Sequence, residues 1–398
     1  MKQYRRQTPL GTKDLLLEES RVRRDVERTL TSLFESRGFS EVMTPGMEYF
    51  DVFSGEKPVV DPEQMYKMTD TKGRLLVMRP DSTLPIARLA ATRLANAPLP
   101  LRLYYAQDVF RMNVGLTGRP DQEFQAGVEL IGVSGMKADI EMIALAASAL
   151  KKTALGGYRL EIGHIGFFES LMEELETDPD VQEEIRSRIE QKNYAALGDL
   201  LDRLPQTDAV AALRRLPRLF GGAEVLDAAG ALCQSERGKE ALHYLASLYQ
   251  ALSKLGLGEQ VMIDLGMLHV NEYYTGVIFR GYIEGSGETV LSGGRYDALV
   301  REFGEDRAAT GFAINVDAIT NVLRQRGSAR PQNPCAVLVH AQDGMEAQAL
   351  AQVESLTEQG VSAEYSVFDS TDAARQYAQQ RGIKELRIVG QTVTIENL

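Results

Sequence analysis

Strand-forming segments occur in two groups along this chain of 398 residues, and a long helical stretch separates them. Runs rich in β-branched and aromatic residues end at 158–165 and resume at 261–265. Between them, residues 167–257 are dominated by Glu, Arg, Leu and Ala, with breaks at Pro179, Pro205, Pro217 and Gly221-Gly222. We therefore predict a group of short helices inserted between two strands of one sheet.

The other strand segments predict a mostly antiparallel sheet. Residues 101–111 and 123–133 are two long strand patterns joined by a polar loop, and Gly285-Ser286-Gly287 marks a hairpin turn. Amphipathic helical spacing occurs at 18–37, 138–152 and 315–326. These patterns predict an α+β fold with helices on one side of the sheet.

A short linker divides the chain into two predicted domains. Residues 327–334 (GSARPQNP) are rich in Pro, Gly and polar residues, as linkers are. Residues 335–398 alternate strand and helix patterns, which is typical of a small α/β unit with a parallel sheet. We therefore predict a main domain over 1–326, with its helical insert at 167–257, and a small α/β domain over 335–398.

The charge balance limits the classes of function. Lys and Arg number 44, Asp and Glu number 56, and the net charge is −12. Such an acidic chain repels phosphate backbones, so a general nucleic-acid binder is not expected. No apolar run reaches the ~20 residues of a membrane span, and no apolar segment follows the basic start to form a signal peptide. We expect a cytoplasmic protein that does not enter a membrane.

The residues that usually hold metals and cofactors are sparse. Cys233 and Cys335 lie far apart in the sequence, and the four histidines are not at metal-ligand spacing. The sequence contains neither a Gly-Lys-Ser/Thr phosphate loop nor a dinucleotide-binding fingerprint. We therefore expect no metal and no cofactor.

Polar residues on one predicted strand could form a binding site. Alternation places Gln125, Gly127 and Glu129 on the same face, and the missing side chain of Gly127 leaves a gap that a small polar molecule could fill. The same pattern also fits the solvent-facing side of an ordinary strand. From these residues alone both interpretations stay open.

Two further segments are equally open when each is taken singly. Residues 293–297 (GGRYD) predict a glycine-rich turn that leads into a helix, either beside a ligand or as a plain turn capped by Asp297. Tyr273 and Tyr274 fall in a strand pattern, so at most one of them should face a site. His269 is more typical of a loop histidine than of a catalytic base.

Taken in order, these segments resemble histidyl-tRNA synthetase, a class II aminoacyl-tRNA synthetase. The resemblance runs from residues 8–14 (TPLGTKD) to the helix after Ala313, and its motifs lie at 38–45, 78–83, 109–129, 271–279 and 293–297. It implies the class II antiparallel sheet with flanking helices, a dimer formed through residues 38–45, and a truncated form of the anticodon-binding domain at 335–398.

The resemblance also implies a pocket for free histidine. Asp81, Thr83 and Gln125 would hold the ammonium group, and Arg111 would face the carboxylate. Glu129 and Tyr274 would hydrogen-bond the imidazole, with Tyr296 nearby.

The positions that handle ATP in the synthetases are altered here. Asn113 replaces the acidic residue that holds adenine, and Asp121 replaces an arginine. His269 and Ala318 stand where arginines contact the α- and γ-phosphates. Since the loss of one such donor typically costs about 3–4 kcal/mol of transition-state stabilisation, adenylation is not expected.

A histidine pocket beside a disabled ATP site resembles the ATP phosphoribosyltransferase regulatory subunits. This resemblance implies a non-catalytic chain in a hetero-oligomer with a short-form catalytic subunit, feedback regulation of histidine biosynthesis by free histidine, and no tRNA. The alternatives are an active histidyl-tRNA synthetase with diverged motifs, or a synthetase-like ligase acting on another molecule. The surface that meets the catalytic subunit, the stoichiometry, the role of the C-terminal domain and a second histidine site at the interface stay open.

Overall fold

The computed structural model describes residues 3–55, 59–113, 119–154, 156–175, 177–268, 273–327 and 335–398. The chain forms two compact units, residues 1–329 and 330–398, and each is described by itself. Within the described ranges no helix combines the length and the apolar character that crossing a membrane requires. The predicted linker at 327–334 lies outside the described residues except for Gly327.

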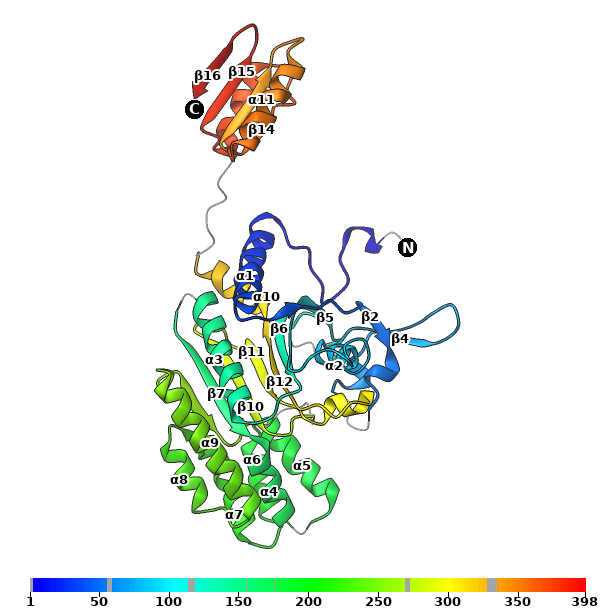
Figure 1. Ribbon diagram of the computed structural model, residues 1–398, viewed down its shortest axis with the longest axis vertical. Coiled ribbons are helices and arrows are strands. Elements are labelled where there is room, and N and C mark those ends of the chain that lie inside the picture. The colour runs from blue at the N-terminus through cyan, green and yellow to red at the C-terminus, as the bar shows by residue number, and fades with distance from the viewer. Residues whose placement is uncertain are drawn as a thin grey trace. The chain divides into compact units, whose positions relative to one another are not determined.

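The first unit is built on a nine-stranded sheet (Figure 1). The strands in spatial order are β1 (Ser40–Glu41), β5 (Leu101–Phe110), β6 (Gln122–Ile131), β12 (Ala309–Asn315), β11 (Leu291–Arg295), β10 (Val277–Ile283), β7 (Tyr158–His164), β9 (Val261–Asp264) and β8 (Phe220–Gly221). Neighbouring strands are antiparallel except for the pairs β1–β5 and β7–β9. The predicted antiparallel sheet is confirmed.

Three helices cover one face of this sheet: α1 (Leu17–Ser36), α3 (Met136–Thr153) and α10 (Val316–Gln325). Strand alternation turns Val128 of β6 and Phe312 of β12 toward these helices, where Phe34 and Met142 complete the core. The residues between them in each strand therefore face the opposite side of the sheet.

The opposite face carries a second hydrophobic core, whereas the sequence patterns predicted helices on one side only. It is covered by α2 (Thr83–Ala91) and by a three-stranded antiparallel sheet of β2 (Met47–Tyr49), β4 (Leu75–Met78) and β3 (Lys67–Thr69). Met65, Val77, Ile86 and Tyr105 are buried there. β2 and β3 have three residues each, which is too few to show a periodic pattern in the sequence.

The predicted helical insert lies between β7 and β9 and forms a compact group of helices (Figure 1). It consists of α4 (Ile165–Glu174), α5 (Pro179–Glu190), α6 (Tyr194–Leu201), α7 (Asp208–Arg215), α8 (Glu224–Gly230) and α9 (Glu236–Lys254). Polar caps begin several of them: Thr207 accepts a hydrogen bond from the N–H of Val210, and Ser235 accepts one from that of Gly238. The two-residue strand β8 within the insert was not predicted.

The second unit is a four-stranded sheet in the order β14 (Ala363–Tyr365), β13 (Val337–Ala341), β15 (Glu385–Val389) and β16 (Val393–Asn397). Helices α11 (Glu346–Glu358) and α12 (Thr371–Arg381) pack over separate apolar clusters. The first three strands are parallel as predicted, but β16 pairs antiparallel with β15. A tight turn makes that pairing possible without a crossover helix.

Candidate functional site

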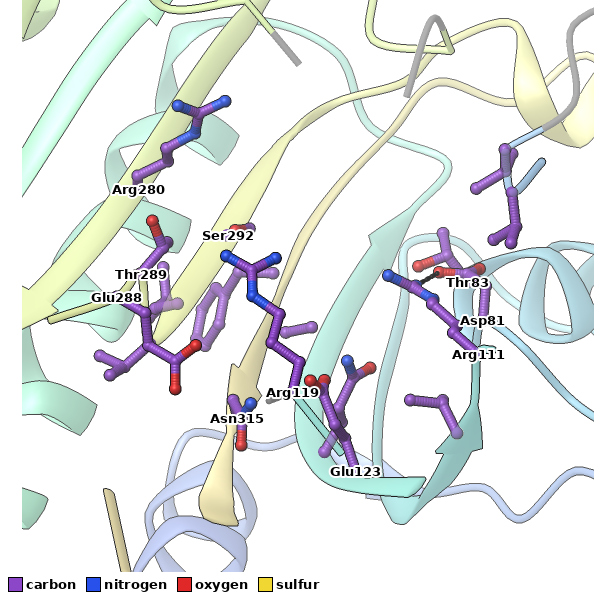
Figure 2. A pocket seen from close by; sticks show the side chains of 18 of the residues that line it. Asp81, Thr83, Arg111, Arg119, Glu123, Arg280, Glu288, Thr289, Ser292 and Asn315 are labelled. Atoms are coloured by element: carbon purple, nitrogen blue, oxygen red, sulfur yellow. Dashed lines mark ion pairs between the residues drawn. The ribbon is translucent and has the colours of Figure 1, made fainter. Parts of the chain in front are cut away.

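A cavity of about 800 Å³ lies in the first unit, on the face of the sheet opposite α1, α3 and α10 (Figure 2). The residues that the resemblance implies for histidine come from four separate regions of the sequence. All of them line this cavity: Asp81, Thr83, Arg111, Gln125, Glu129, Tyr274 and Tyr296. The strand alternation that places Gln125 and Glu129 on one face therefore points both side chains into it.

Glu129 is the most deeply buried acidic group of the cavity, with 2% of its surface exposed. Its Oε1 accepts a hydrogen bond of 2.9 Å from the hydroxyl of Thr83, and its Oε2 accepts one from the hydroxyl of Tyr296. Burial raises the pKa of this carboxyl to about 8, although the two hydrogen bonds lower it. With this pKa, the protonated form predominates at neutral pH.

A glycine on the neighbouring strand makes room for this carboxyl. A Cβ atom on Gly311 of β12 would lie only 1.9 Å from Oε2 of Glu129 and 2.4 Å from the carbonyl oxygen of Val128. No side chain fits between these atoms. Gly311 therefore fixes how closely the Glu129 carboxyl can lie against the sheet.

Asp81 and Arg111 provide a pair of opposite charges in the same cavity. Oδ1 of Asp81 accepts a hydrogen bond from the N–H of Leu84 at the start of α2, and its Oδ2 lies 3.6 Å from Nη2 of Arg111. The Nε of Arg111 donates to the carbonyl of Pro80 at 2.6 Å. Figure 2 shows Arg111 turned toward Asp81. This arrangement matches the two charged ends of a free amino acid.

Tyrosines form an aromatic wall of the cavity. The rings of Tyr273 and Tyr274 lie 4.4 Å apart between centroids, and Tyr273 meets the edge of Tyr296 at 5.7 Å. Both Tyr273 and Tyr274 line the cavity, so the expectation that at most one would face a site is wrong. The reason is that β10 begins only at Val277, and strand alternation does not apply before it.

The predicted glycine-rich turn at 293–297 is also corrected. Gly293, Gly294 and Arg295 lie within β11, where both glycines pair with β10 and β12 and Arg295 pairs with β12. The two glycines serve close packing, because a Cβ on Gly294 would lie 2.6 Å from the ring of Tyr274 and one on Gly293 would meet Phe312. Only after Asp297 does the chain enter a short 3₁₀ helix, Leu299–Phe303.

The predicted gap above Gly127 is filled by the protein itself. A Cβ on Gly127 would lie 2.5 Å from the hydroxyl oxygen of Tyr105, which reaches across from the adjacent strand β5. Gly127 therefore accommodates a tyrosine rather than leaving empty space over the sheet. The sequence of β6 alone could not show which neighbouring side chain would lie there.

A buried ion pair lies on the face of β11 opposite to the tyrosines. Arg295, which precedes Tyr296, lies on the helix-covered face of β11 and pairs with Asp139 of α3 at 2.7 Å and with Asp297 at 3.0 Å. The hydroxyl of Tyr244 in the insert also donates to Asp139. This network joins β11, α3 and α9 directly behind the cavity.

Another part of the cavity wall lies beside the loop between β5 and β6, next to Arg111, whose backbone N–H donates to the carbonyl of Asp121 at 2.8 Å. The carboxylate of Asp121 accepts hydrogen bonds from the backbone N–H of Asn113 at 3.0 Å and from the hydroxyl of Tyr66. The bond to Asp121 and burial raise the pKa of Tyr66 to about 12. The backbone N–H of Asp121 donates to the carbonyl of Gly11 at 2.7 Å. Asn113 and Asp121, two positions that the resemblance assigns to the ATP site, are thus hydrogen-bonded to each other.

Of the two remaining altered positions, only Ala318 falls within the described residues. Ala318 is in the first turn of α10, where its N–H donates to Oδ1 of Asn315 at 2.9 Å. It belongs to the core beneath the helices and is not among the residues that line the cavity. His269 falls outside the described residues.

Several lining residues were not singled out from the sequence. Arg280 and Tyr282 alternate on β10 with core residues, and that pattern could have indicated their face. Lys192 comes from the insert, which no periodic signal connects to the cavity. Figure 2 shows Arg280 and Glu288 across the pocket from Arg111.

Comparisons with known proteins agree with this architecture. A model of the histidyl-tRNA synthetase family matches residues 11–319. An ATP phosphoribosyltransferase regulatory subunit of Clostridium kluyveri is 39% identical, over 98% of this chain and 100% of its own length. One of Bacillus cereus is 36% identical, over 96% of this chain and 91% of its own.

Solved structures share the fold. A crystal structure described as an ATP phosphoribosyltransferase regulatory subunit/histidyl-tRNA synthetase from Bacillus halodurans has a TM-score of 0.85 and 30% identity, and covers 94% of this chain and 97% of that one. Histidyl-tRNA synthetase from Nostoc sp. has a TM-score of 0.79 at 21% identity, over 98% and 94%. The predicted class II synthetase-like fold is confirmed.

Proposed function

This chain belongs to the family of ATP phosphoribosyltransferase regulatory subunits, and on that premise we propose that it regulates this enzyme of histidine biosynthesis without catalysing a reaction itself. Its partner is the short-form catalytic subunit, in a hetero-oligomer, and its effector is free histidine. Neither aminoacylation nor tRNA binding is part of this function. The cytoplasm is the expected compartment.

The observation that carries the proposal is a difference between two adjoining parts of the cavity wall, which we call the amino-acid end and the loop end. At one end, Asp81, Arg111 and Glu129 present charged and polar groups toward the cavity. At the loop end, the Asp121 carboxylate accepts a hydrogen bond from Asn113, and the resemblance implies that it replaces an arginine of the ATP site. Because phosphoryl and adenylyl transfer depend on preorganised positive charge, this pattern favours amino-acid binding without ATP chemistry.

Histidine would bind by replacing contacts that the lining residues make with one another, such as the pair of Asp81 and Arg111. Its ammonium group fits Asp81, Thr83 and Gln125, and its carboxylate fits the guanidinium of Arg111. Its imidazole fits Glu129 and Tyr274, because the ring can both donate and accept hydrogen bonds. Regulation then requires that histidine bind two arrangements of the complex with different affinities. The difference in binding free energy is typically about 1–3 kcal/mol.

Self-association through residues 38–45 is part of the same proposal. Met43 within this segment and Met47 just after it are 77% and 55% exposed. The guanidinium of Arg79 donates to the carbonyls of Thr44 and Pro45 at 2.7 and 2.8 Å, and this holds the backbone between the two methionines in one conformation. Exposed apolar side chains on a fixed backbone are typical of a protein interface.

Histidine binding and inhibition test the proposal. With the catalytic subunit present, Arg111→Ala should weaken histidine inhibition about 100-fold, because a charge-assisted pair is lost. Arg119→Ala, which removes another cation of the same cavity, is the matched control and should change it less than about threefold. Equal inhibition of wild type and Arg111→Ala, or histidine-dependent ATP–pyrophosphate exchange by the purified chain, would contradict the proposal.

A further inference from the structure

The second unit has one long strand at the edge of its sheet. β16 is the last strand in the order of this sheet, and in the described part of the chain it pairs with β15 alone (Figure 1). It has five residues, whereas each of the other described strands at a sheet edge has two or three. Short edge strands are one way in which proteins avoid strand pairing between chains. β16 lacks this protection.

The side chains of β16 do not protect the edge either. Its sequence, VTIEN, contains neither Lys nor Pro, the residues that most often block an edge. Val393 and Ile395 are apolar but 47% and 54% exposed. The charged side chain of Glu396 forms an ion pair with Arg375 of α12 at 2.8 Å, on the other face of the sheet. The edge of β16 therefore presents apolar side chains and no unpaired side-chain charge.

The pairing of β16 with β15 determines which backbone groups point outward. At the end of this ladder, the N–H of Leu398 donates to the carbonyl of Lys384 at 2.8 Å. In an antiparallel ladder, residues that bond to the neighbouring strand alternate with residues whose N–H and C=O groups point away from it. The backbone groups of Val393, Ile395 and Asn397 therefore point to the open edge, where they can bind another strand.

These three residues are arranged symmetrically about Ile395. If a second copy of β16 approaches in the antiparallel direction, Ile395 lies opposite the same residue of the other copy, and Val393 lies opposite Asn397. Each outward N–H and C=O group then gains a hydrogen-bond partner. On the other face of the strands, Thr394 lies opposite Glu396, so no like charges meet directly. The edge is thus complementary to itself.

We propose that the second units of two chains associate through β16, in an antiparallel pair centred on Ile395 that joins their two sheets into one. A second copy is the occupant because the edge matches itself in backbone groups, in apolar side chains and in charge. This inference goes beyond the proposed function and depends on neither histidine nor the catalytic subunit. Two strands of five residues form a contact smaller than the roughly 1,200 Å² of stable interfaces, so the pairing is reversible.

Disulfide trapping in the full chain tests both the contact and its register. Cα atoms of an antiparallel hydrogen-bonded pair lie about 5.5 Å apart, a separation that a disulfide can span. Ile395→Cys should therefore give a disulfide-linked dimer under mild oxidation. Val393→Cys is the matched control, because the two Val393 positions lie roughly 13 Å apart along the paired strands. We expect the linked fraction of Ile395→Cys to be at least about fivefold higher.

A mixture of two variants tests the register independently. Val393→Cys and Asn397→Cys chains should cross-link when mixed, because these positions lie opposite each other, whereas neither variant should do so alone. Cys233 and Cys335 are present in every variant and in the wild type, so the wild type measures any linkage through them. Co-purification with the catalytic subunit is followed in Ile395→Lys, which places a charge on the edge.

Three outcomes would overturn the inference and leave the proposed function intact. Equal linked fractions for Ile395→Cys and Val393→Cys would show random collision or another register. The absence of a linked Ile395→Cys dimer would show that the edges of two chains do not meet. Loss of the catalytic subunit from Ile395→Lys, together with that absence, would assign the edge to the catalytic subunit instead.

Discussion

The two ends of the cavity satisfy their polar groups in different ways. At the amino-acid end, Glu129 lies on a strand, is almost fully buried, and accepts hydrogen bonds from Thr83 and Tyr296 across the cavity. At the loop end, Asn113 and Asp121 are half-buried and bond to each other within one loop. The difference teaches that polar groups lining one cavity can find partners either across the cavity, between separate elements, or within a single loop.

The strongest test of this contrast is the pH dependence of stability. Because burial raises the pKa of Glu129 from 4.5 to about 8, the folded chain binds this proton more tightly than the unfolded chain. Its stabilising contribution is complete below about pH 4.5 and is lost as the pH rises through 8. Between these values the free energy of unfolding should fall by up to about 1.4 kcal/mol per pH unit relative to Glu129→Gln.

Urea denaturation of both proteins at several pH values measures this difference. Other groups cancel in the comparison, including His164, whose pKa burial lowers to about 4 and whose effect has the opposite sign. Parallel curves for wild type and Glu129→Gln would mean that the carboxyl is ionised in the folded chain. Burial would then not raise the pKa of the Glu129 carboxyl, and the contrast with the half-buried loop end would be lost.

A smaller effect tests how tightly the amino-acid end is packed. Gly311→Ala places a methyl group 1.9 Å from Oε2 of Glu129, and we expect it to destabilise the fold by about 3 kcal/mol. Gly46→Ala is the control, since nothing lies within 4 Å of its Cβ position, and it should change stability by less than about 0.5 kcal/mol. Thermal unfolding measures both. Similar midpoints for the two variants would show that the carboxyl moves freely.

The smallest effects concern the loop end. Asp121→Ala removes the acceptor for the N–H of Asn113 and for the hydroxyl of Tyr66, so the free energy of unfolding should fall by about 2 kcal/mol. Tyr66→Phe removes one of these bonds and should cost about 1 kcal/mol. Histidine affinity should change less than about threefold in both. A large loss of affinity would show that the two ends act as one site.

Strand periodicity predicted part of this site correctly. Gln125 and Glu129 lie in the middle of a long strand, where alternation determines the face of each residue. The same rule failed for Tyr273 and Tyr274, because their segment precedes β10 and follows no strand geometry. Alternation therefore predicts the face of a side chain only where its residue lies within a strand that is paired with its neighbours.

The glycines were harder to interpret from the sequence. Gly127 indicates a close approach, but the group that approaches is Tyr105 of another strand rather than a ligand. Gly293 and Gly294 are strand residues on which Phe312 and Tyr274 pack, whereas a glycine pair predicts a turn when its neighbours are unknown. In each case the missing information is the side chain opposite the glycine, which only the fold supplies.

The ion pair between Asp81 and Arg111 has a consequence for which molecules can enter. A zwitterion placed between them replaces the Asp81–Arg111 pair by two new pairs, its ammonium with Asp81 and its carboxylate with Arg111. The total charge of the site stays the same. Histamine, which lacks the carboxylate, would leave the guanidinium without a counterion, and imidazolepropionate would do the same to the aspartate. Discrimination between an intact amino acid and its decarboxylated or deaminated derivatives thus follows from electroneutrality alone.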